Sequence, residues 1–191
     1  MKKNLYLIIA CCLICASQLS AQETTFDQGD NVVGVGIGLG GTLYSGSYYS
    51  LSGVSKLPTF ILSYERCIIG NLFNDQSSLG VGGLVGYSTA KYDYSNYGWR
   101  STNLMIGARG ALHYAFVDKL DTYAGIMFGY NINTWKWTGE WGSASRGSSA
   151  SSGLYYTLFA GARYYLADAF AVFAEVGYGY TILTAGVSFK F

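Results

Sequence analysis

The amino-acid sequence predicts an all-β fold: an eight-stranded antiparallel up-and-down transmembrane β-barrel preceded by a cleaved signal peptide. Three observations lead to this fold class. The first residues are arranged as in an export signal, the remainder is apolar, aromatic and glycine-rich without a long apolar helix, and large apolar residues alternate with small or polar ones along most of the chain. Such a period of two is typical of strands with one apolar face.

Residues 1–21 form the expected signal peptide. Two lysines precede an apolar stretch over residues 5–16, and the small residue Ala21 stands where cleavage is expected. These are the three parts of an export signal. A lipoprotein signal ending at Cys11 would leave too short an apolar core, and a retained anchor needs about 18 or more apolar residues. We therefore expect residues 22–191 to form one outer-membrane β-barrel domain.

The composition after the signal limits the possible functions. Two of the twelve Lys and Arg residues lie in the signal, so the remaining chain has ten basic and eleven acidic residues. This nearly neutral balance predicts no nucleic-acid partner. Cys67 is the single cysteine after the signal, so a disulfide and the cysteine pairs of a zinc site are not expected, nor is a cofactor. Charged residues make up only 12%, against about 25% in soluble chains. Lipid-facing strands, whose apolar residues are diluted by alternation, have this composition.

The expected strands are residues 33–40, 58–67, 79–91, 102–116, 121–135, 154–166, 170–178 and 181–191. The first alternates large apolar residues with glycine, and the second places Phe60 and Leu62 opposite Glu65. The third alternates valine and leucine with glycine, and the fourth sets its apolar residues opposite Arg109 and His113. Each pattern gives one apolar and one polar face.

The last four strands continue the pattern. The fifth sets apolar residues opposite glycine and asparagine, the sixth opposite Arg163, the seventh opposite Glu175 and the eighth opposite Lys190. Long connections rich in Ser, Gly and Tyr are expected at 43–57, 92–101 and 136–152, and tight turns at 117–120 and 167–169. Outer-membrane barrels have long outer loops and short periplasmic turns. The connection at 68–77 is long for a turn, and the last outer loop, near Gly179, is almost absent.

The chemistry of the two faces predicts which one meets lipid. Hydrocarbon tolerates the aliphatic face but not the charged one, so the charges should point inward. Because every backbone polar group needs a partner in lipid, the sheet should close, and eight strands leave an interior that side chains or one small ligand can fill.

A secreted soluble barrel of the lipocalin kind is the structural alternative, and it would reverse the two faces. Two observations favour the membrane barrel: charges are nearly absent from the middle of each apolar face, and aromatic residues gather at strand ends, where interface girdles lie. The aromatic residues at strand ends are Tyr44, Tyr64, Tyr87, Tyr114, Tyr130, Tyr156, Tyr164 and Phe191.

The last residues carry a resemblance to a known group. Gly186, Val187, Phe189 and Phe191 belong to an alternating segment that closes on a terminal Phe. The chain thereby resembles the small outer-membrane β-barrels of the OmpX-like and OmpA-barrel group of porin-family proteins, and residues 175–180 resemble the ends of such barrels from the Bacteroidetes. The resemblance implies a place in the bacterial outer membrane, contact with its lipid and delivery to the barrel assembly machinery. Because members of the group differ in function, it does not imply one.

Six ionisable side chains share the inward parity: Glu65, Arg109, His113, Arg163, Glu175 and Lys190. Buried charges need partners, so a salt-bridged filling of the lumen is the main interpretation, and a gated ion or proton path is the alternative. Arg163 and Glu175 flank one tight turn within diagonal reach of each other, which predicts that they pair.

Two further patterns point to chemistry but lack what that chemistry requires. An acyltransferase, deacylase or protease barrel would need a His with Ser or Asp near the outer rim, and His113 falls at the periplasmic end of its strand. Residues 36–41 match the G-x-G-x-x-G string of dinucleotide-binding folds, but no helical pattern follows. We therefore expect no catalytic residues.

The expected outer loops concentrate aromatic side chains beside polar ones. The candidate interaction residues there are Tyr94, Tyr97, Trp99, Trp137 and Trp141. Such residues stack on sugars or anchor a protein partner, whereas girdle anchoring or loop packing would need no ligand. The sequence thus predicts a non-enzymatic barrel with a filled lumen and a structural or surface-interaction role, a narrow low-conductance channel being the alternative.

Overall fold

The computed structural model describes residues 25–40, 54–94, 97–139 and 148–191, and every regular element within them is a β-strand. None of these residues forms a helix long and apolar enough to cross a membrane. The strands are β1 (Asn31–Leu39), β2 (Ser55–Lys56), β3 (Thr59–Gly70), β4 (Ser77–Tyr94), β5 (Tyr97–Val117), β6 (Leu120–Gly139), β7 (Ser148–Ala167), β8 (Phe170–Tyr178) and β9 (Leu183–Lys190).

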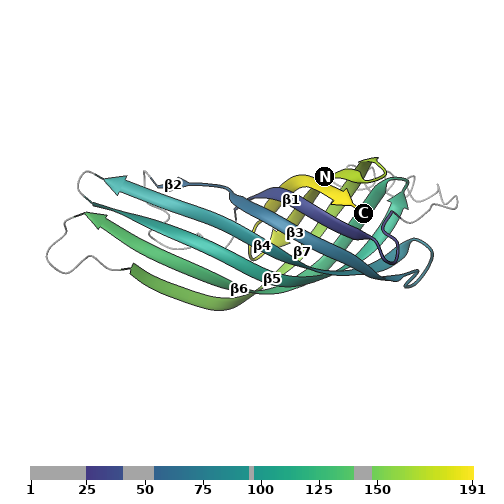
Figure 1. Cartoon of the computed structure of the whole chain (residues 1–191), viewed down its shortest axis with the longest axis horizontal. Helices are drawn as coiled ribbons and strands as arrows, with labels where there is room; N and C mark the ends of the chain where they lie inside the picture. Colours follow the sequence, from purple (N-terminus) through teal and green to yellow (C-terminus); the bar gives the residue numbers. More distant parts are fainter. Residues whose placement is uncertain (1–24, 41–53, 95–96, 140–147) are drawn as a thin grey trace, which may run out of the picture.

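The strands form one closed antiparallel barrel (Figure 1). From β3 to β9 each strand pairs with the next along the chain, and β1 joins β3 on one side to β9 on the other. The ring therefore has eight strands, and the two-residue β2 is an addition that pairs with β4. Reciprocal bonds between the backbones of Asn31 and Phe191, of 3.0 and 2.9 Å, continue the seam of β1 and β9 to the end of the chain. The predicted fold class is confirmed.

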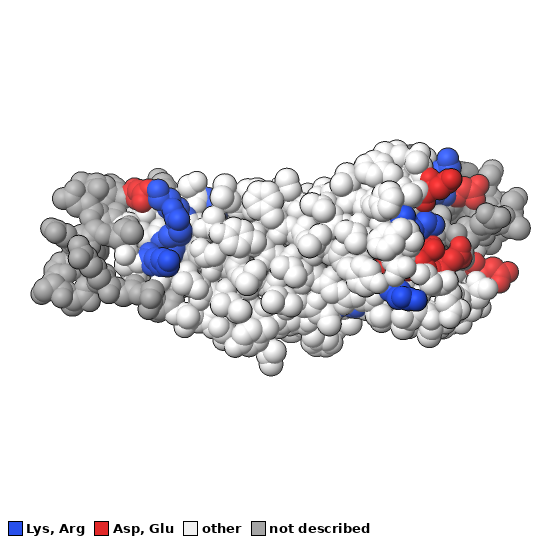
Figure 2. All heavy atoms as spheres, viewed as in Figure 1, with Lys and Arg blue, Asp and Glu red and all other residues white. Residues whose placement is uncertain are grey.

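The outward face of the barrel is apolar, as alternation predicted. Figure 2 shows a broad band without charged side chains between two charged ends of the molecule. The exposed residues of this face include Val35, Ile37, Phe60, Leu62, Val81, Val85, Leu104, Ile106, Leu112, Ile126, Phe128, Leu158, Val172, Val176, Val187 and Phe189. This reverses the arrangement of a soluble barrel, which would bury these residues.

Aromatic residues predicted at strand ends are exposed on the same face at Tyr64, Tyr87, Tyr130, Tyr156, Tyr164 and Phe191. Tyr114 is half-buried and its hydroxyl donates a hydrogen bond of 2.8 Å to Gln76 Oε1. Tyr44 lies outside the described residues.

Strand length divides the barrel into a short and a long side. The strands β4 to β7 have 18 to 21 residues, whereas β1, β8 and β9 have eight or nine. The four long strands therefore project beyond the rest of the barrel (Figure 1). We call this end the extended end, and the opposite end, where residues 71–76, 118–119 and 168–169 connect the strands, the turn end.

Two predicted loops are wrong in extent. Residues 92–101 belong almost entirely to β4 and β5, with only 95–96 between the strands, and the predicted loop 136–152 shrinks to 140–147. Sequence alternation weakened in these stretches because a strand outside a membrane needs no apolar outer face. The inward parity nevertheless continues, since Trp99, Ser101 and Asn103 are all buried.

Candidate functional site

The lumen of the barrel holds the charged residues that the sequence singled out. Three of them, Glu65, His113 and Arg163, form a closed ring of ion pairs with Asp121 near the turn end, contributed by β3, β5, β6 and β7. Nδ1 of His113 lies 2.9 Å from Asp121 Oδ1, and its Nε2 lies 3.2 Å from Glu65 Oε1. The guanidinium of Arg163 donates one bond of 3.1 Å to each of the same two carboxylates.

Each carboxylate in this ring is bridged by two cationic groups. Because both ring nitrogens of His113 face carboxylate oxygens, the imidazolium, with two N–H donors, satisfies both contacts, whereas a neutral ring would satisfy one. Two cations then balance two anions, and all four side chains are buried. Such a network is what allows charges to lie inside a barrel wall.

A second ion pair lies next to this ring, toward the extended end. The guanidinium of Arg109 is 2.9 Å from Glu175 Oε2, which also accepts a hydrogen bond of 3.1 Å from the hydroxyl of Tyr123. The guanidinium also lies over the ring of Phe159, 4.1 Å from its centroid. The glycine between Tyr123 and Glu175 makes this meeting possible, because a Cβ at Gly161 would lie 2.7 Å from Glu175 Cγ and 2.8 Å from Tyr123 Cε2.

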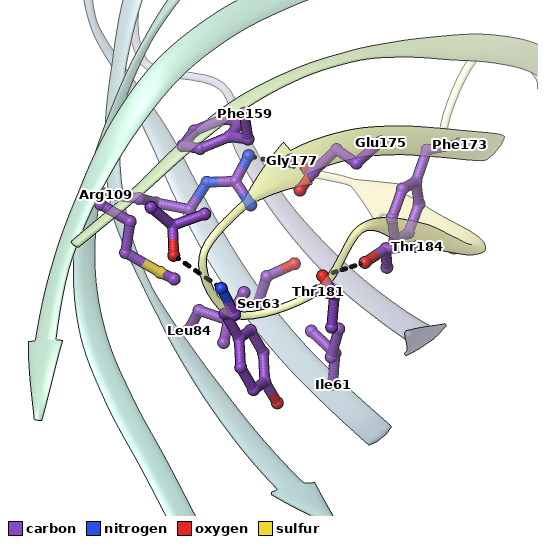
Figure 3. A pocket seen from close by; sticks show the side chains of 13 residues that line it. Ile61, Ser63, Leu84, Arg109, Phe159, Phe173, Glu175, Gly177, Thr181 and Thr184 are labelled. Carbon is purple, nitrogen blue, oxygen red and sulfur yellow. Dashed lines mark hydrogen bonds and ion pairs between the residues drawn. The ribbon is translucent and has the colours of Figure 1, made fainter. Parts of the chain in front are cut away.

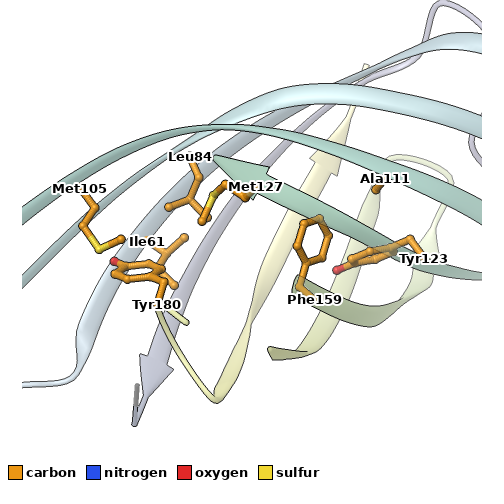
Figure 4. Close-up of a cluster of buried hydrophobic side chains, with 8 residues drawn as sticks. All are labelled: Ile61, Leu84, Met105, Ala111, Tyr123, Met127, Phe159 and Tyr180. Carbon is orange, nitrogen blue, oxygen red and sulfur yellow. The ribbon is translucent and has the colours of Figure 1, made fainter. Parts of the chain in front are cut away.

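Apolar side chains close the lumen beyond the second pair (Figure 4). The connection between β8 and β9 turns inward, so that Tyr180 packs with Ile61, Leu84, Met105 and Met127 rather than reaching solvent. Gly86 on β4 makes room for it, since a Cβ there would overlap the Tyr180 hydroxyl. The backbone N–H of Tyr180 donates a bond of 3.2 Å to Thr157 Oγ1.

Phe26, which precedes β1, closes the turn end of the lumen. Its ring centroid lies 4.5 Å from that of His113, and Arg163 lies over it at 5.7 Å. The residue is buried together with Val32 and Cys67, and Lys190 holds the preceding residue by a bond of 3.1 Å from Nζ to Thr25 O. The segment before β1 therefore covers the ring of ion pairs.

Small cavities lie between these layers. Two cavities of about 20 and 10 Å³ lie in the described part of the lumen. Both are lined by Ser63, Arg109, Phe173 and Glu175, and Figure 3 shows the larger of the two. A water molecule needs roughly 10–15 Å³, so each cavity has room for about one.

Glu65, Arg109, His113 and Arg163 are buried in the lumen, but their pairing differs from the predicted one. The predicted pair of Arg163 with Glu175 is wrong: Arg163 binds Glu65 and Asp121, and Glu175 binds Arg109. Asp121 is directly opposite Arg163 on β6, closer than the diagonal position on β8. Lys190 lies apart from the network, with its Nζ 3.3 Å from Asp30 Oδ2 at the turn end.

Sequence reasoning missed Asp121, Tyr123 and Phe26. The inward parity of the fifth predicted strand includes Asp121 and Tyr123, so counting polar residues on that parity would have found them. Phe26 carries no such signal, because it lies before the first strand and reaches the lumen only through the fold.

The candidate interaction residues are spread over the extended end. Trp99 is 3% exposed and faces inward, with its ring centroid 4.9 Å from that of Trp135, whereas Trp137 is 41% exposed. Tyr94 ends β4, and Tyr97 begins β5 directly opposite it. Trp141 lies outside the described residues.

The C-terminal residues belong to the seam of the barrel. Gly186 lies opposite Gly36, and Val187 lies opposite Val35. Val187, Phe189 and Phe191 are exposed on the outward face.

Comparison with solved structures identifies the fold. Ail, the attachment invasion locus protein of Yersinia pestis, matches in its complex with the heparin analogue sucrose octasulfate with a TM-score of 0.53 and 13% identity, over 86% of this chain and 99% of that chain. A second structure of Ail matches with a TM-score of 0.51 and the same identity and coverage. A designed transmembrane β-barrel has a TM-score of 0.47 at 17% identity, over 86% and 98% of the two chains.

The chain has the fold of a small transmembrane β-barrel. Searches against protein-family models and curated protein sequences found no match. The likeness at 13% identity therefore concerns the fold alone.

Proposed function

We propose that this protein is a non-enzymatic integral protein of the bacterial outer membrane, related to the OmpX-like barrels, whose closed lumen gives a rigid base to an outward-facing sheet that takes part in surface interactions. The closed lumen is the observation that carries the proposal. Phe26, the ring of ion pairs, the Arg109–Glu175 pair and the cluster around Tyr180 fill it in succession. A wide pore does not fit this filling.

Two features support the outer-membrane location. The exposed apolar band would be unstable in water but suits hydrocarbon, and closure of the sheet pairs the backbone as lipid requires. Phe189 and Phe191, which resemble part of the assembly signal of outer-membrane proteins, are exposed on the outward face. Delivery by the barrel assembly machinery is part of the proposal.

The surroundings of the single histidine of the sequence support a non-catalytic role. Both nitrogens of His113 are engaged by carboxylates, and Phe26 covers the ring. A general acid or base must reach its substrate, and this imidazole has no such approach.

The extended end is the proposed interaction surface. The strands β4 to β7 project there, and Trp137 presents an exposed indole beside strand ends that carry Tyr94 and Tyr97. Ail has been solved with a heparin analogue. For this chain we propose a glycan or protein ligand at the extended end, and removal of Trp137 and Trp141 together should weaken attachment to such a ligand.

A narrow channel is the second candidate, because the two small cavities share Arg109 and Glu175 in their linings. Movement of that pair would join them. The closed barrel and the channel differ in whether water passes through the interior.

Single-channel recording in planar bilayers tests the choice. The wild-type protein, with folding verified by its heat-modifiable gel shift, should give no reproducible steps. The variants Arg163→Ala and Tyr180→Ala each remove part of the filling and serve as positive comparisons. Reproducible wild-type steps whose size changes in Arg163→Ala would refute the closed lumen and establish the channel.

A further inference from the structure

Three basic side chains stand in one row across the projecting sheet. Lys91 on β4 lies directly opposite Arg100 on β5, which lies directly opposite Lys136 on β6. All three are exposed, and the neighbouring residues of opposite parity, such as Ala90 and Ser101, are buried inside. The row therefore lies on the outer wall of the barrel.

The row lies just beyond the apolar band. The last outward-facing apolar row is Tyr87, Leu104 and Ile132, and one row of threonines, Thr89, Thr102 and Thr134, separates it from the basic row. Successive rows on one face are about 7 Å apart along the strands, and the flexible stems of Lys and Arg can bend toward the membrane. Figure 2 shows basic side chains gathered at this end, beyond the uncharged band.

Within the described ranges, only one of the three charges of this row has an acidic partner in the protein. Like charges directly opposite each other in neighbouring strands repel. Lys91 has Asp93 as an ion-pair partner, but within the described ranges Arg100 and Lys136 have no acidic partner. An anion from outside the protein would remove the repulsion.

We propose that this row binds the phosphate groups of a phosphorylated glycolipid in the outer leaflet of the membrane. The inference rests on the proposed outer-membrane location. Adjacent strands lie about 5 Å apart, so the flexible side chains of two neighbouring cations can reach one phosphate, and the guanidinium of Arg100 can bind two phosphate oxygens at once. The position next to the apolar band selects a headgroup over a soluble anion, because the acyl chains then lie along the apolar face of the same wall.

The test measures binding of bis-phosphorylated lipid A by the full mature protein, kept folded in a neutral detergent. Native mass spectrometry counts bound lipid, and titration gives an affinity. Lipid A treated with phosphatase is the matched ligand. The double variant Arg100→Gln with Lys136→Gln should bind lipid A at least tenfold more weakly, and high salt should weaken the wild-type binding.

A matched control removes two exposed cations at the turn end, with Arg66→Gln and Lys119→Gln. This variant should bind within twofold of wild type. Arg100→Lys with Lys136 retained should keep more of the affinity than Arg100→Gln. The gel shift reports whether each variant is folded, and the outward, exposed positions should leave it unchanged.

Three outcomes would overturn the inference. Equal affinity for intact and dephosphorylated lipid A would exclude the phosphates as ligands. If the extended-end and turn-end variants lose the same affinity for lipid A, net charge rather than the row would explain the binding. If inorganic phosphate at millimolar concentration displaces lipid A, or if sucrose octasulfate binds the row as tightly as lipid A does, the row would be assigned to soluble anions. A folded, silent barrel without phosphate preference overturns only this inference, whereas a conducting barrel that keeps it overturns only the closed lumen.

Discussion

Removal of Arg163 gives the sharpest test of the ring of ion pairs. The substitution Arg163→Met keeps most of the volume but deletes two charge-assisted hydrogen bonds, one to Glu65 and one to Asp121. Each such bond contributes about 1.5–3 kcal/mol, and loss of one partner of a buried ion pair costs about 3–5 kcal/mol. Both carboxylates stay buried with only His113 between them, so the free energy of unfolding should fall by about 3–5 kcal/mol.

The companion variant separates the loss of a contact from the presence of uncompensated charge. The triple variant Glu65→Gln, Asp121→Asn and Arg163→Met removes both anions along with the cation, and His113 can then be neutral. It should recover most of the stability that the single variant loses, because no carboxylate is left unpaired. Lys91→Met is the control, since the side chains of its ion pair with Asp93 are 50% and 60% exposed and the pair should contribute less than about 1 kcal/mol.

Urea unfolding of the refolded barrel in lipid vesicles, followed by tryptophan fluorescence, measures these free energies by linear extrapolation. A single-variant loss below about 1 kcal/mol would refute the reasoning that the ring neutralises costly buried charges. A triple variant less stable than the single one would refute it as well. That result would show that Glu65 and Asp121 stabilise the barrel even without Arg163 to neutralise them.

Three other predictions concern the layers above and below this ring and the outer wall. Gly86→Leu should displace Tyr180 and lower the stability by about 1–3 kcal/mol in the same unfolding assay, and an unchanged midpoint would contradict the packing of that residue against β4. Phe26→Ala should cost about 3–5 kcal/mol and expose Cys67, which a maleimide should then modify in the folded barrel but not in wild type. Equal labelling in both proteins would show that Phe26 does not cover the turn end. Val35→Arg, on the outward face, should destabilise the vesicle-bound barrel by about 2–4 kcal/mol if that position meets lipid near the midplane, and an effect near zero would place it in water.

The sequence was sufficient for the architecture because the membrane imposes a strict pattern. Alternation in residues such as Val35 and Ile37 and the inward parity of Arg109 and Arg163 follow from pairing every backbone group while presenting apolar side chains to lipid. These are local properties, and each strand shows them separately. The same reasoning failed for the projecting parts of β4 to β7, where water on the outer face removes the pattern.

Only the tertiary structure decided which charges meet. Parity placed Arg163 and Glu175 on the same face, but the partners depend on register and on glycines across the lumen, and these brought Arg163 to Asp121 and left Glu175 to Arg109. Phe26 and Tyr180 close the lumen from segments outside the strands, where no periodic pattern applies. The sequence by itself thus determined which side of the wall each residue faces, since that depends on a period of two along one strand. What fills the interior depends on distances between strands far apart in the chain, which only the closed barrel determines.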